Sequence, residues 1–270
     1  MTMKDLKGKV VLLTGGSRGL GPVIAESLAK QGAIIALTAR SKTGLDAVAK
    51  NLRAMGAKVL TLPVDLSQPS LREKLITDVL NEFDKIDILI NNAGLETEGA
   101  YTELPWASIQ ETIEVNLLAP MELTHLVLPG MLEKKSGHIV NIASIAAKSG
   151  GPYAATYSGT KAGMAEWTRG LRLELRNSGI HFSTIFPGYV REVGMFARFG
   201  MTPPRMVGSC HPLKVAEAVV RAIVNGRKEV IVNSQPLRYV FMLNEFSPSM
   251  GDWLMRVSGA SDFQRRKVGR

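Results

Sequence analysis

Short runs of branched apolar residues alternate along this chain with longer stretches in which apolar residues recur every three or four positions. The short runs predict buried β-strands, and the longer stretches predict amphipathic helices. The predicted strands cover Val10–Thr14, Ile34–Thr38, Val59–Val64, Ile86–Ile90, His138–Ala143 and Ile180–Phe186. The predicted helices cover Val23–Gln31, Leu45–Met55, Ser70–Phe83 and two long regions near Trp106–Leu132 and Tyr153–Asn177.

Strands that are apolar along most of their length and separated by helices indicate a parallel sheet covered on both faces. Right-handed crossovers then give an α/β fold: a single doubly wound, Rossmann-like sheet whose ligand crevice lies beyond the carboxyl ends of the strands. A last short strand, Glu229–Val232, precedes residues that we expect to form a C-terminal helical extension. We therefore expect one domain at 1–235 and an extension at 236–270.

Composition narrows the class of protein. The 270 residues are 45% hydrophobic and 21% charged, which is typical of a globular fold with a sizeable core. The single cysteine, Cys210, allows no internal disulfide and favours a reducing compartment. No uninterrupted apolar run reaches the roughly 18 residues that span a bilayer, and Met1–Lys9 lacks the apolar stretch of a secretory signal. We therefore expect a cytoplasmic protein.

The net charge of +9 favours anionic ligands or surfaces. The basic excess is spread along the chain, and only 6% of the residues are aromatic. A nucleic-acid-binding protein would concentrate the charge on one element and offer aromatic platforms for bases, so we expect no nucleic-acid partner.

A glycine-rich segment, Thr14-Gly15-Gly16-Ser17-Arg18-Gly19-Leu20-Gly21, lies between the first predicted strand and the first predicted helix. Glycines in this position allow the backbone to approach a pyrophosphate, and the helix N-terminus supplies N–H groups and a partial positive charge. The segment therefore predicts a dinucleotide site.

The end of the second predicted strand indicates which dinucleotide binds. An acidic residue there would bind the ribose hydroxyls of NAD, but the sequence has Arg40 followed by Ser41. Arg40, Ser41 and Arg18 suit a 2′-phosphate, so the predicted cofactor is NADP(H). The alternative is that both arginines are solvated surface charges. Asp65, after the third strand, would either accept a hydrogen bond from the adenine amino group or cap the next helix.

Candidate chemistry lies early in the second long helical region. Tyr157 and Lys161 are four residues apart and so share one helix face. A nearby ammonium lowers the pKa of a phenol, which would let Tyr157 exchange a proton with a carbonyl or alcohol oxygen. Ser144, at the end of the fifth strand, is placed to hydrogen-bond the same oxygen. In isolation, such a Tyr–Lys pair is more often structural than catalytic.

Together these motifs resemble the short-chain dehydrogenase/reductase family of nicotinamide-dependent oxidoreductases, over roughly residues 5–232. The matching motifs, in chain order, are the glycine-rich segment at 14–21, Asn91-Asn92-Ala93-Gly94, Asn116, Ser144, Tyr157 with Lys161, and Pro187-Gly188.

The resemblance implies a role for each matching residue. Tyr157 would be the general acid in reduction and the base in oxidation, Lys161 would hold the nicotinamide ribose, and Ser144 would position the carbonyl. Asn116 would hold a water that links Lys161 to solvent. The expected cofactor-binding residues are Gly15, Ser17, Arg18, Gly19, Leu20, Gly21, Arg40, Ser41, Asp65, Leu66, Asn92, Ala93, Gly94, Tyr157, Lys161, Pro187, Gly188 and Val190. No metal is expected.

The chain departs from the family pattern in three places. Arg191 stands where the family commonly has a threonine that contacts the carboxamide, so it would face either an anionic substrate group or solvent. The glycine-rich strand ending of bacterial acyl-carrier ketoreductases is absent, which leaves the usual tetramer packing open. Glu96 and Glu98 follow Gly94, with no clear expectation for either.

The segment after Gly188 and the one after Ser144 are expected to wall the substrate. Both are apolar or small, which favours a hydrophobic ketone or secondary alcohol. The alternative is that the Met and Phe side chains only pack against the core. The expected pocket residues are Ile145, Ala146, Gly151, Tyr189, Met195, Phe196 and Phe199.

These residues predict an NADPH-dependent reductase of a hydrophobic ketone or aldehyde. The alternative substrate is a 3-oxoacyl thioester on an acyl carrier or coenzyme A, with Lys134-Lys135 docking an acidic carrier. A remote alternative is a non-catalytic cofactor-binding regulator.

Residues 236–270 would form a lid, an oligomer contact or a membrane-surface contact, because residues 231–270 carry six basic and three acidic residues among aromatic ones. The two long helical regions form the dimer face in relatives, so a homodimer or homotetramer is expected.

Overall fold

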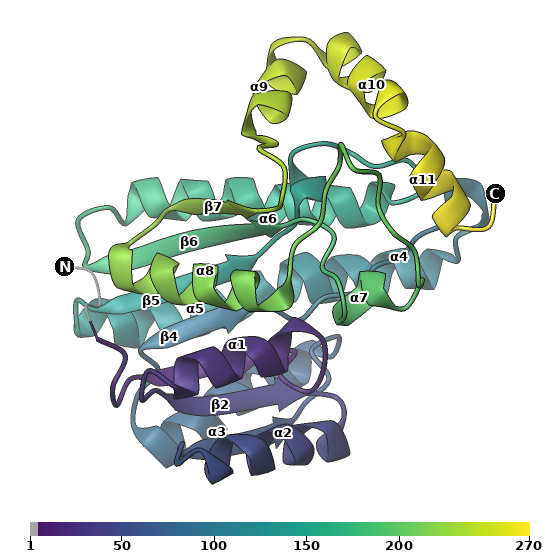
Figure 1. The fold of residues 1–270 in the computed structure, drawn as a ribbon. Helices are drawn as coiled ribbons and strands as arrows, with labels where there is room; N and C mark the ends of the chain where they lie inside the picture. Colours follow the sequence, from purple (N-terminus) through teal and green to yellow (C-terminus); the bar gives the residue numbers. More distant parts are fainter. Residues whose placement is uncertain (1–4) are drawn as a thin grey trace.

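A seven-stranded parallel sheet forms the centre of the molecule, in the order β3-β2-β1-β4-β5-β6-β7 (Figure 1). This computed structural model describes residues 5–270; the first four residues of the charged N-terminal segment lie outside the described range. The strands are β1 (Val10–Thr14), β2 (Ile34–Ala39), β3 (Val59–Pro63), β4 (Ile88–Asn91), β5 (Gly137–Ile142), β6 (Ile180–Pro187) and β7 (Glu229–Val232). The chain order reverses between β1 and β4, the place where such sheets bind ligands.

Helices cover both faces of the sheet, and two apolar clusters fill the space between the layers. On one face lie α1 (Leu20–Ala29), α2 (Lys42–Ala54) and α8 (Pro212–Asn225), whose apolar side chains pack on β1, β2 and β6. On the other lie α3 (Arg72–Phe83), α5 (Ala119–Glu133) and the C-terminal part of α6 (Ala155–Glu174). The predicted α/β fold with a doubly wound parallel sheet is therefore confirmed.

Several predicted boundaries differ from the observed ones by a few residues, and two of the differences have clear local reasons. Strand β4 begins at Ile88 rather than Ile86, because the side chain of Asp87 takes the backbone N–H of Val10 that a strand partner would otherwise use. The region near Trp106–Leu132 is three elements: α4 (Trp106–Ile113), a π-helical turn η3 (Glu114–Leu118) and α5. A π-turn leaves no mark on apolar periodicity over so short a span.

Within the described residues, one helical run has the length and mean hydropathy of a membrane span. It covers Trp106–Glu133, with a mean hydropathy of 1.2 over its most apolar window. That window is 44% buried, and α5 contributes Leu123 and Val127 to the apolar cluster beneath the sheet. The run is therefore a core helix of this fold.

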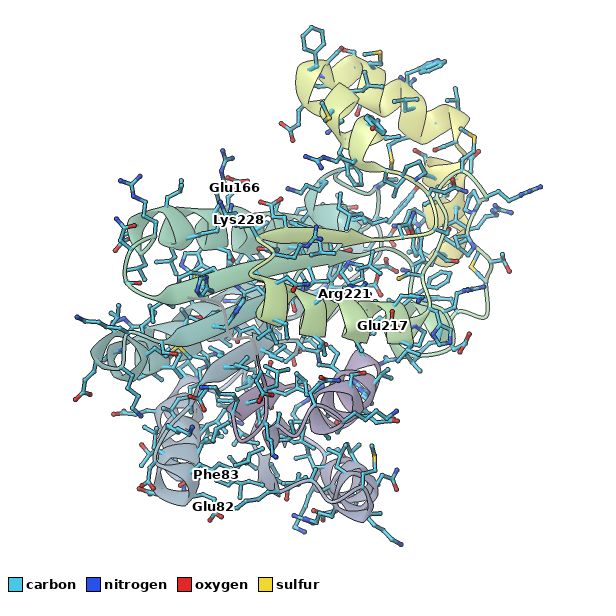
Figure 2. The ribbon with its side chains drawn as sticks, turned by 60° about the vertical axis from the view of Figure 1, so that its left-hand side comes forward. Glu82, Phe83, Glu166, Glu217, Arg221 and Lys228 are labelled. Carbon is cyan, nitrogen blue, oxygen red and sulfur yellow. The ribbon has the colours of Figure 1, made fainter. Side chains whose placement is uncertain are left out.

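The segment after β7 forms three helices, α9 (Arg238–Phe246), α10 (Pro248–Val257) and α11 (Ala260–Lys267). In Figure 1, α9 and α10 project from the body as an arm, and α11 returns along the edge formed by the carboxyl ends of the strands, near the short helix α7 (Gly194–Ala197). Figure 2 shows side chains standing out from the arm, while charged groups such as Glu217 and Arg221 cover the outer face of α8. The extension is thus helical, as expected, and it lies over the ligand edge of the sheet.

Candidate active site

The glycine-rich turn between β1 and α1 is shaped by close backbone contacts. Gly15 has a φ of 68°, and a Cβ there would lie 2.9 Å from the Cα of Ala93. A Cβ on Gly21 would collide with the carbonyl oxygen of Gly15. Only glycine meets these conditions, and α1 begins directly after Gly19, so its free N–H groups face the crevice.

The segment after β4 holds this turn in place. The hydroxyl of Thr14 accepts hydrogen bonds from the backbone N–H groups of Asn92 (3.0 Å) and Ala93 (2.9 Å). The Asn92 side chain donates to the carbonyl of Thr14 at 2.9 Å and of Gly15 at 3.2 Å. Asn92, Ala93 and Gly94 therefore form the wall opposite the glycine-rich turn.

The two basic residues predicted for a 2′-phosphate, Arg18 and Arg40, are exposed and line one end of a cavity of about 810 Å³. Nη1 of Arg40 lies 3.4 Å from Oε1 of Glu111 in an exposed ion pair. Ser41 also lines the cavity, and its hydroxyl caps α2 by accepting from the N–H of Gly44. All three side chains reach the cavity mouth without being buried.

Asp65 also lines the cavity, but one of its oxygens already has local partners. Its Oδ1 accepts from the backbone N–H of Ser67 at 3.0 Å and from its hydroxyl at 2.8 Å. Asp65 therefore holds the turn after β3 and keeps Oδ2 for another donor.

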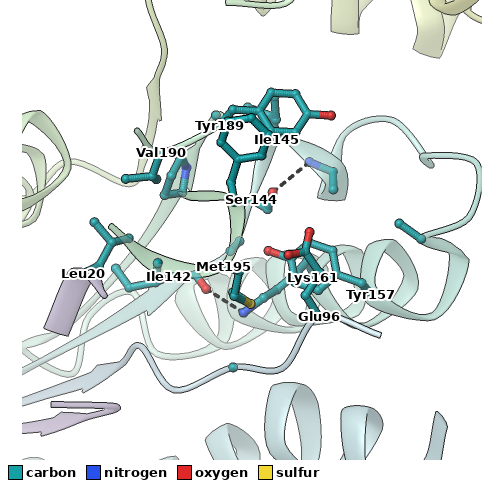
Figure 3. Close-up of a pocket in the computed structure, with 18 of the residues that line it drawn as sticks. Leu20, Glu96, Ile142, Ser144, Ile145, Tyr157, Lys161, Tyr189, Val190 and Met195 are labelled. Carbon is teal, nitrogen blue, oxygen red and sulfur yellow. Dashed lines mark hydrogen bonds between the residues drawn. The ribbon is translucent and has the colours of Figure 1, made fainter. Parts of the chain in front are cut away.

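The reactive side chains meet where β5 ends and α6 begins (Figure 3). Tyr157 is 8% exposed and Lys161 is 2% exposed, on one face of α6. The ammonium of Lys161 donates to the carbonyl of Ile142 at 2.9 Å and lies 5.9 Å from the centre of the Tyr157 ring. Ser144 lies beside Tyr157 and accepts from the N–H of Ala146, which fixes its hydroxyl at the end of β5.

The predicted lowering of the Tyr157 pKa is wrong for this structure. Burial raises the pKa of Tyr157 strongly, and the charges of Glu96 and Glu98 raise it further, while a hydrogen bond from Ser144 lowers it. Burial also lowers the pKa of Lys161 to about 8. Glu96 and Glu98 depart from the family pattern, but no sequence signal places their carboxylates beside the tyrosine.

Asn116 lies in the π-turn η3 and is fully buried. Its side chain accepts from the N–H of Leu95 at 2.7 Å and donates to the carbonyl of Leu95 at 2.8 Å and to the hydroxyl of Thr160 at 3.2 Å. These bonds join η3 to α6 and to the segment after β4. The side chain is therefore occupied in tying three elements together, and it does not border the cavity.

The buried guanidinium of Arg72, which the sequence gave no reason to single out, supports η3 from below. Arg72 is 1% exposed and pairs with Glu114 in η3 and Glu122 in α5, and it also donates to the carbonyl of Leu66.

Most of the predicted site residues line the same cavity. Of the predicted cofactor residues, all but Gly21 border it; of the predicted pocket residues, all but Phe199 do. Gly21 packs behind Gly15, and Phe199 is 40% exposed, with its ring beside Lys267. Arg191 is exposed, lies outside this cavity and lines a second, smaller pocket with Pro203 and Ser234.

The C-terminal extension supplies a large part of the cavity wall. The lining side chains from this segment include Leu237, Val240, Phe241, Leu254, Met255 and Gln264. Glu96 also lines the cavity. The amphipathic pattern of residues 236–270 predicts helices, but it does not show which face of each helix lies against the cavity.

Lys134 and Lys135 lie away from this cavity. They come just before β5, and Lys135 lies against Gly179 just before β6, so they are at the opposite edge of the sheet from the cavity. The predicted docking of an acyl carrier on these lysines would therefore use the edge of the sheet opposite the cavity. Among residues 5–270, no group of three or more His, Cys, Asp or Glu side chains is arranged to hold a metal ion.

Comparison with known proteins gives consistent relatives. A family model described as short chain dehydrogenase matches residues 9–202. A ketoacyl reductase, HetN, from Nostoc sp. (strain PCC 7120) is 41% identical over 271 residues, covering 98% of this chain and 94% of the relative. A crystal structure of an actinorhodin polyketide ketoreductase with NADPH superimposes with a TM-score of 0.77 at 31% identity, covering 88% of this chain and 98% of the other. A metagenomic short-chain oxidoreductase in complex with NADP gives 0.73 at 31% identity, covering 84% of this chain and 97% of the other.

Proposed function

Because the chain belongs to the short-chain dehydrogenase family, we propose that it is an NADPH-dependent oxidoreductase that reduces a ketone or aldehyde group on a hydrophobic substrate. One observation carries the proposal: the glycine-rich turn, Arg18 and Arg40, and Ser144, Tyr157 and Lys161 all border one cavity. A dinucleotide lying along this cavity joins the basic end to the tyrosine end.

The residues present fit NADP(H). The turn at Gly15–Gly19 and the N-terminus of α1 suit the pyrophosphate, and Arg18, Arg40 and Ser41 suit the 2′-phosphate. Asp65 would meet the adenine, while Pro187, Gly188 and Val190 border the nicotinamide end. Two structural relatives were solved with NADP or NADPH, which supports the same choice here.

The chain's own residues supply the proton and the orientation. When bound, the nicotinamide supplies a hydride to the carbonyl carbon. The Tyr157 hydroxyl donates its proton to the carbonyl oxygen in reduction, and its phenolate takes a proton from the alcohol in oxidation. Ser144 donates a hydrogen bond to the same oxygen, and Lys161, whose ammonium lies 5.9 Å from the centre of the Tyr157 ring, would bind the ribose. Asn116 acts on this pair through Thr160 and Leu95.

The cavity favours a hydrophobic substrate. Beyond Tyr157 its wall is formed by Ile145, Ala146, Met195 and Phe196, together with apolar residues of α9 and α10. Flexible Met and aromatic side chains suit an aliphatic or polycyclic body.

The names of two relatives favour a second candidate substrate, a 3-oxoacyl thioester. HetN is named a ketoacyl reductase, and the actinorhodin enzyme is a polyketide ketoreductase. Docking of an acidic carrier on Lys134 and Lys135, at the edge of the sheet opposite the cavity, stays part of this second candidate. Rates on carrier-bound, coenzyme A-bound and free ketones of equal chain length distinguish the two candidates.

The central test is turnover of NADPH with a panel of aliphatic, aromatic, steroid and 3-oxoacyl ketones. Tyr157→Phe should lower the rate by about 10²- to 10⁴-fold, because it removes the proton donor. Tyr101→Phe, at a 59% exposed tyrosine outside the cavity, is the matched control. Equal rates in wild type and Tyr157→Phe would refute the mechanism. Tight NADPH binding with no turnover across the panel would favour a cofactor-binding regulator.

We further propose a homodimer or homotetramer assembled through the two long helical regions, near Trp106–Leu132 and Tyr153–Asn177. These regions expose large apolar side chains: Trp106 in α4 is 64% exposed, Leu118 in η3 is 43% exposed and Leu173 in α6 is 64% exposed. Leu173→Glu should lower the mass measured by light scattering to that of the monomer, and an unchanged oligomer would refute this face.

For location, we propose the cytoplasm, with residues 1–235 as the catalytic unit and 236–270 as its extension. The charge of α9 and α10 is balanced, with Arg238 and Arg256 against Glu245 and Asp252. Contact of the arm with a membrane would therefore depend on exposed apolar side chains, such as Phe246 at 88%. Flotation with vesicles, compared between wild type and Phe246→Ser, tests whether the arm contacts a membrane. Absence of the wild-type protein from the vesicle fraction would refute membrane contact.

A further inference from the structure

Lys267, near the C-terminus, is buried although the two basic residues before it on α11 are exposed. Its side chain is 1% exposed, whereas Arg265 and Arg266 are exposed. Removing an ammonium from water is costly unless it is paired. The partners of Lys267 come from the segment after β4: its Nζ lies 2.8 Å from Oε1 of Glu96 and 2.6 Å from Oε1 of Glu98. An ion cluster thus joins the end of the chain to a loop about 170 residues earlier.

The same lysine contacts the segment that closes the substrate end of the cavity. Its Nζ lies 4.5 Å from the ring centre of Phe199 and 5.9 Å from that of Phe196. Such distances suit a cation–π interaction. One turn earlier on α11, Phe263 packs edge-on to Tyr189 at 5.4 Å and lies 5.9 Å from Phe196. The helix α11 therefore binds two segments that wall the cavity, one after β4 and one after β6.

The acidic partners of Lys267 also act on the catalytic tyrosine. Figure 3 places Glu96 beside Tyr157 and Lys161, at the cavity wall. Of the charges that raise the pKa of Tyr157, that of Glu96 is the largest and that of Glu98 is next. The same two carboxylates raise the pKa of Tyr189. The state of the ion cluster thus influences the proton donor directly.

The cluster has two carboxyl groups and one ammonium in a buried place. Burial and the charge of Glu96 raise the pKa of Glu98 to about 7, against the lowering effect of Lys267. Oε2 of Glu98 is buried without a hydrogen-bond partner among the described residues. A proton on Glu98, which this raised pKa favours below about pH 7, reduces the negative charge of the cluster.

We propose that Lys267 is a positioning residue for carbonyl reduction. By pairing with Glu96 and Glu98, it binds the C-terminal helix to the active site and limits the negative charge beside Tyr157. By contacting Phe196 and Phe199, it shapes the substrate wall. The inference rests on the proposed reduction at Tyr157. The groups that face the cluster are Tyr157 from α6 and Tyr189 from the segment after β6, with Lys161 behind Tyr157.

Removal of Lys267 has two expected consequences. The rings of Phe196 and Phe199 lose a partner, so the KM for the ketone should rise by about tenfold, because misplacement of a wall lowers productive binding. The two carboxylates lose their compensating charge, so the pH at which alcohol oxidation reaches half its maximal rate should rise by about one unit. The KM for NADPH should not change, because Arg18 and Arg40 lie at the other end of the cavity.

The experiment compares Lys267→Met with Arg266→Met, an exposed basic residue of the same helix. A third variant, Lys267→Met with Glu96→Gln and Glu98→Gln, removes the uncompensated charge and should bring the pH profile back to that of the wild type, although the KM for the ketone stays raised. If Lys267→Met matches Arg266→Met in both KM and pH profile, or if the triple variant keeps the shifted profile, the proposal is wrong.

Hydrogen exchange provides a readout that needs no turnover. In Lys267→Met the amides of residues 95–98 and 196–199 should exchange faster, while those of β1 and β4 keep their protection. If exchange is faster in Lys267→Met but the wild type reduces no ketone, α11 does hold these two segments and the proposed reduction is wrong. Unchanged exchange in an active enzyme would overturn the inference alone.

Discussion

Replacing Arg40 by alanine tests how the chain selects its cofactor, and the structure gives the expected size of the effect. Arg40 is 53% exposed, and its ion pair with Glu111 at 3.4 Å is of the exposed kind that contributes about 0–1 kcal/mol. A hydrogen bond from arginine to a phosphate contributes about 1.5–3 kcal/mol. Because the Glu111 pair must be given up on binding, the net loss is about 0.5–3 kcal/mol, which raises the KM for NADPH by about 2- to 140-fold.

The assay is the initial rate at varied NADPH and, separately, varied NADH. The KM for NADH should stay within about twofold, because that cofactor has no 2′-phosphate. Lys42→Ala is the matched control, since Lys42 is an exposed neighbour that pairs with Asp46 and lies outside the cavity. Glu111→Gln should lower the KM for NADPH, because it frees Arg40. Equal losses for NADPH and NADH in Arg40→Ala would show that the residue contributes to shape and not to phosphate recognition.

Three further predictions follow from buried charges. Arg72→Met should lower the free energy of unfolding in urea by about 3 kcal/mol, because it leaves two carboxylates without their buried partner. The control Arg169→Met, at an exposed ion pair, should change it by less than about 1 kcal/mol. Equal losses in the two variants would contradict the burial argument. Burial lowers the pKa of His138 to about 3, so the folded state binds no proton near pH 5 while the unfolded state does, and stability should fall by about 2 kcal/mol between pH 8 and pH 5. His138→Gln should remove that dependence and exposed His125→Gln should keep it, which urea unfolding at the two pH values checks. Since burial lowers the pKa of Lys161 to about 8, the ammonium is lost above that pH, and kcat/KM for reduction should decline from about pH 8 upward; a profile flat to pH 10 would contradict this.

Much of the fold can be predicted from the local pattern of apolar and polar residues. Branched apolar runs such as Val10–Thr14 have no polar face, so they can only be central strands, and the helices between them force parallel connections. The glycines at 15, 19 and 21 and the spacing of Tyr157 and Lys161 are local too, because each depends on a turn or on one helix face. For this reason most of the residues that line the cavity beside the glycine-rich turn could be predicted, and the comparisons confirm the family that these motifs suggested.

The tertiary structure alone decided what surrounds those residues. Whether Phe199 and Gly21 border the cavity depends on packing that no local pattern records, and so does the position of Lys134 and Lys135 at the far edge of the sheet. The pKa of Tyr157 is set by burial and by Glu96 and Glu98, whose pairing with Lys267 spans most of the chain. Charges act through space and across low-dielectric surroundings, so the chemistry of the tyrosine is fixed only when the end of the chain has folded back over the site.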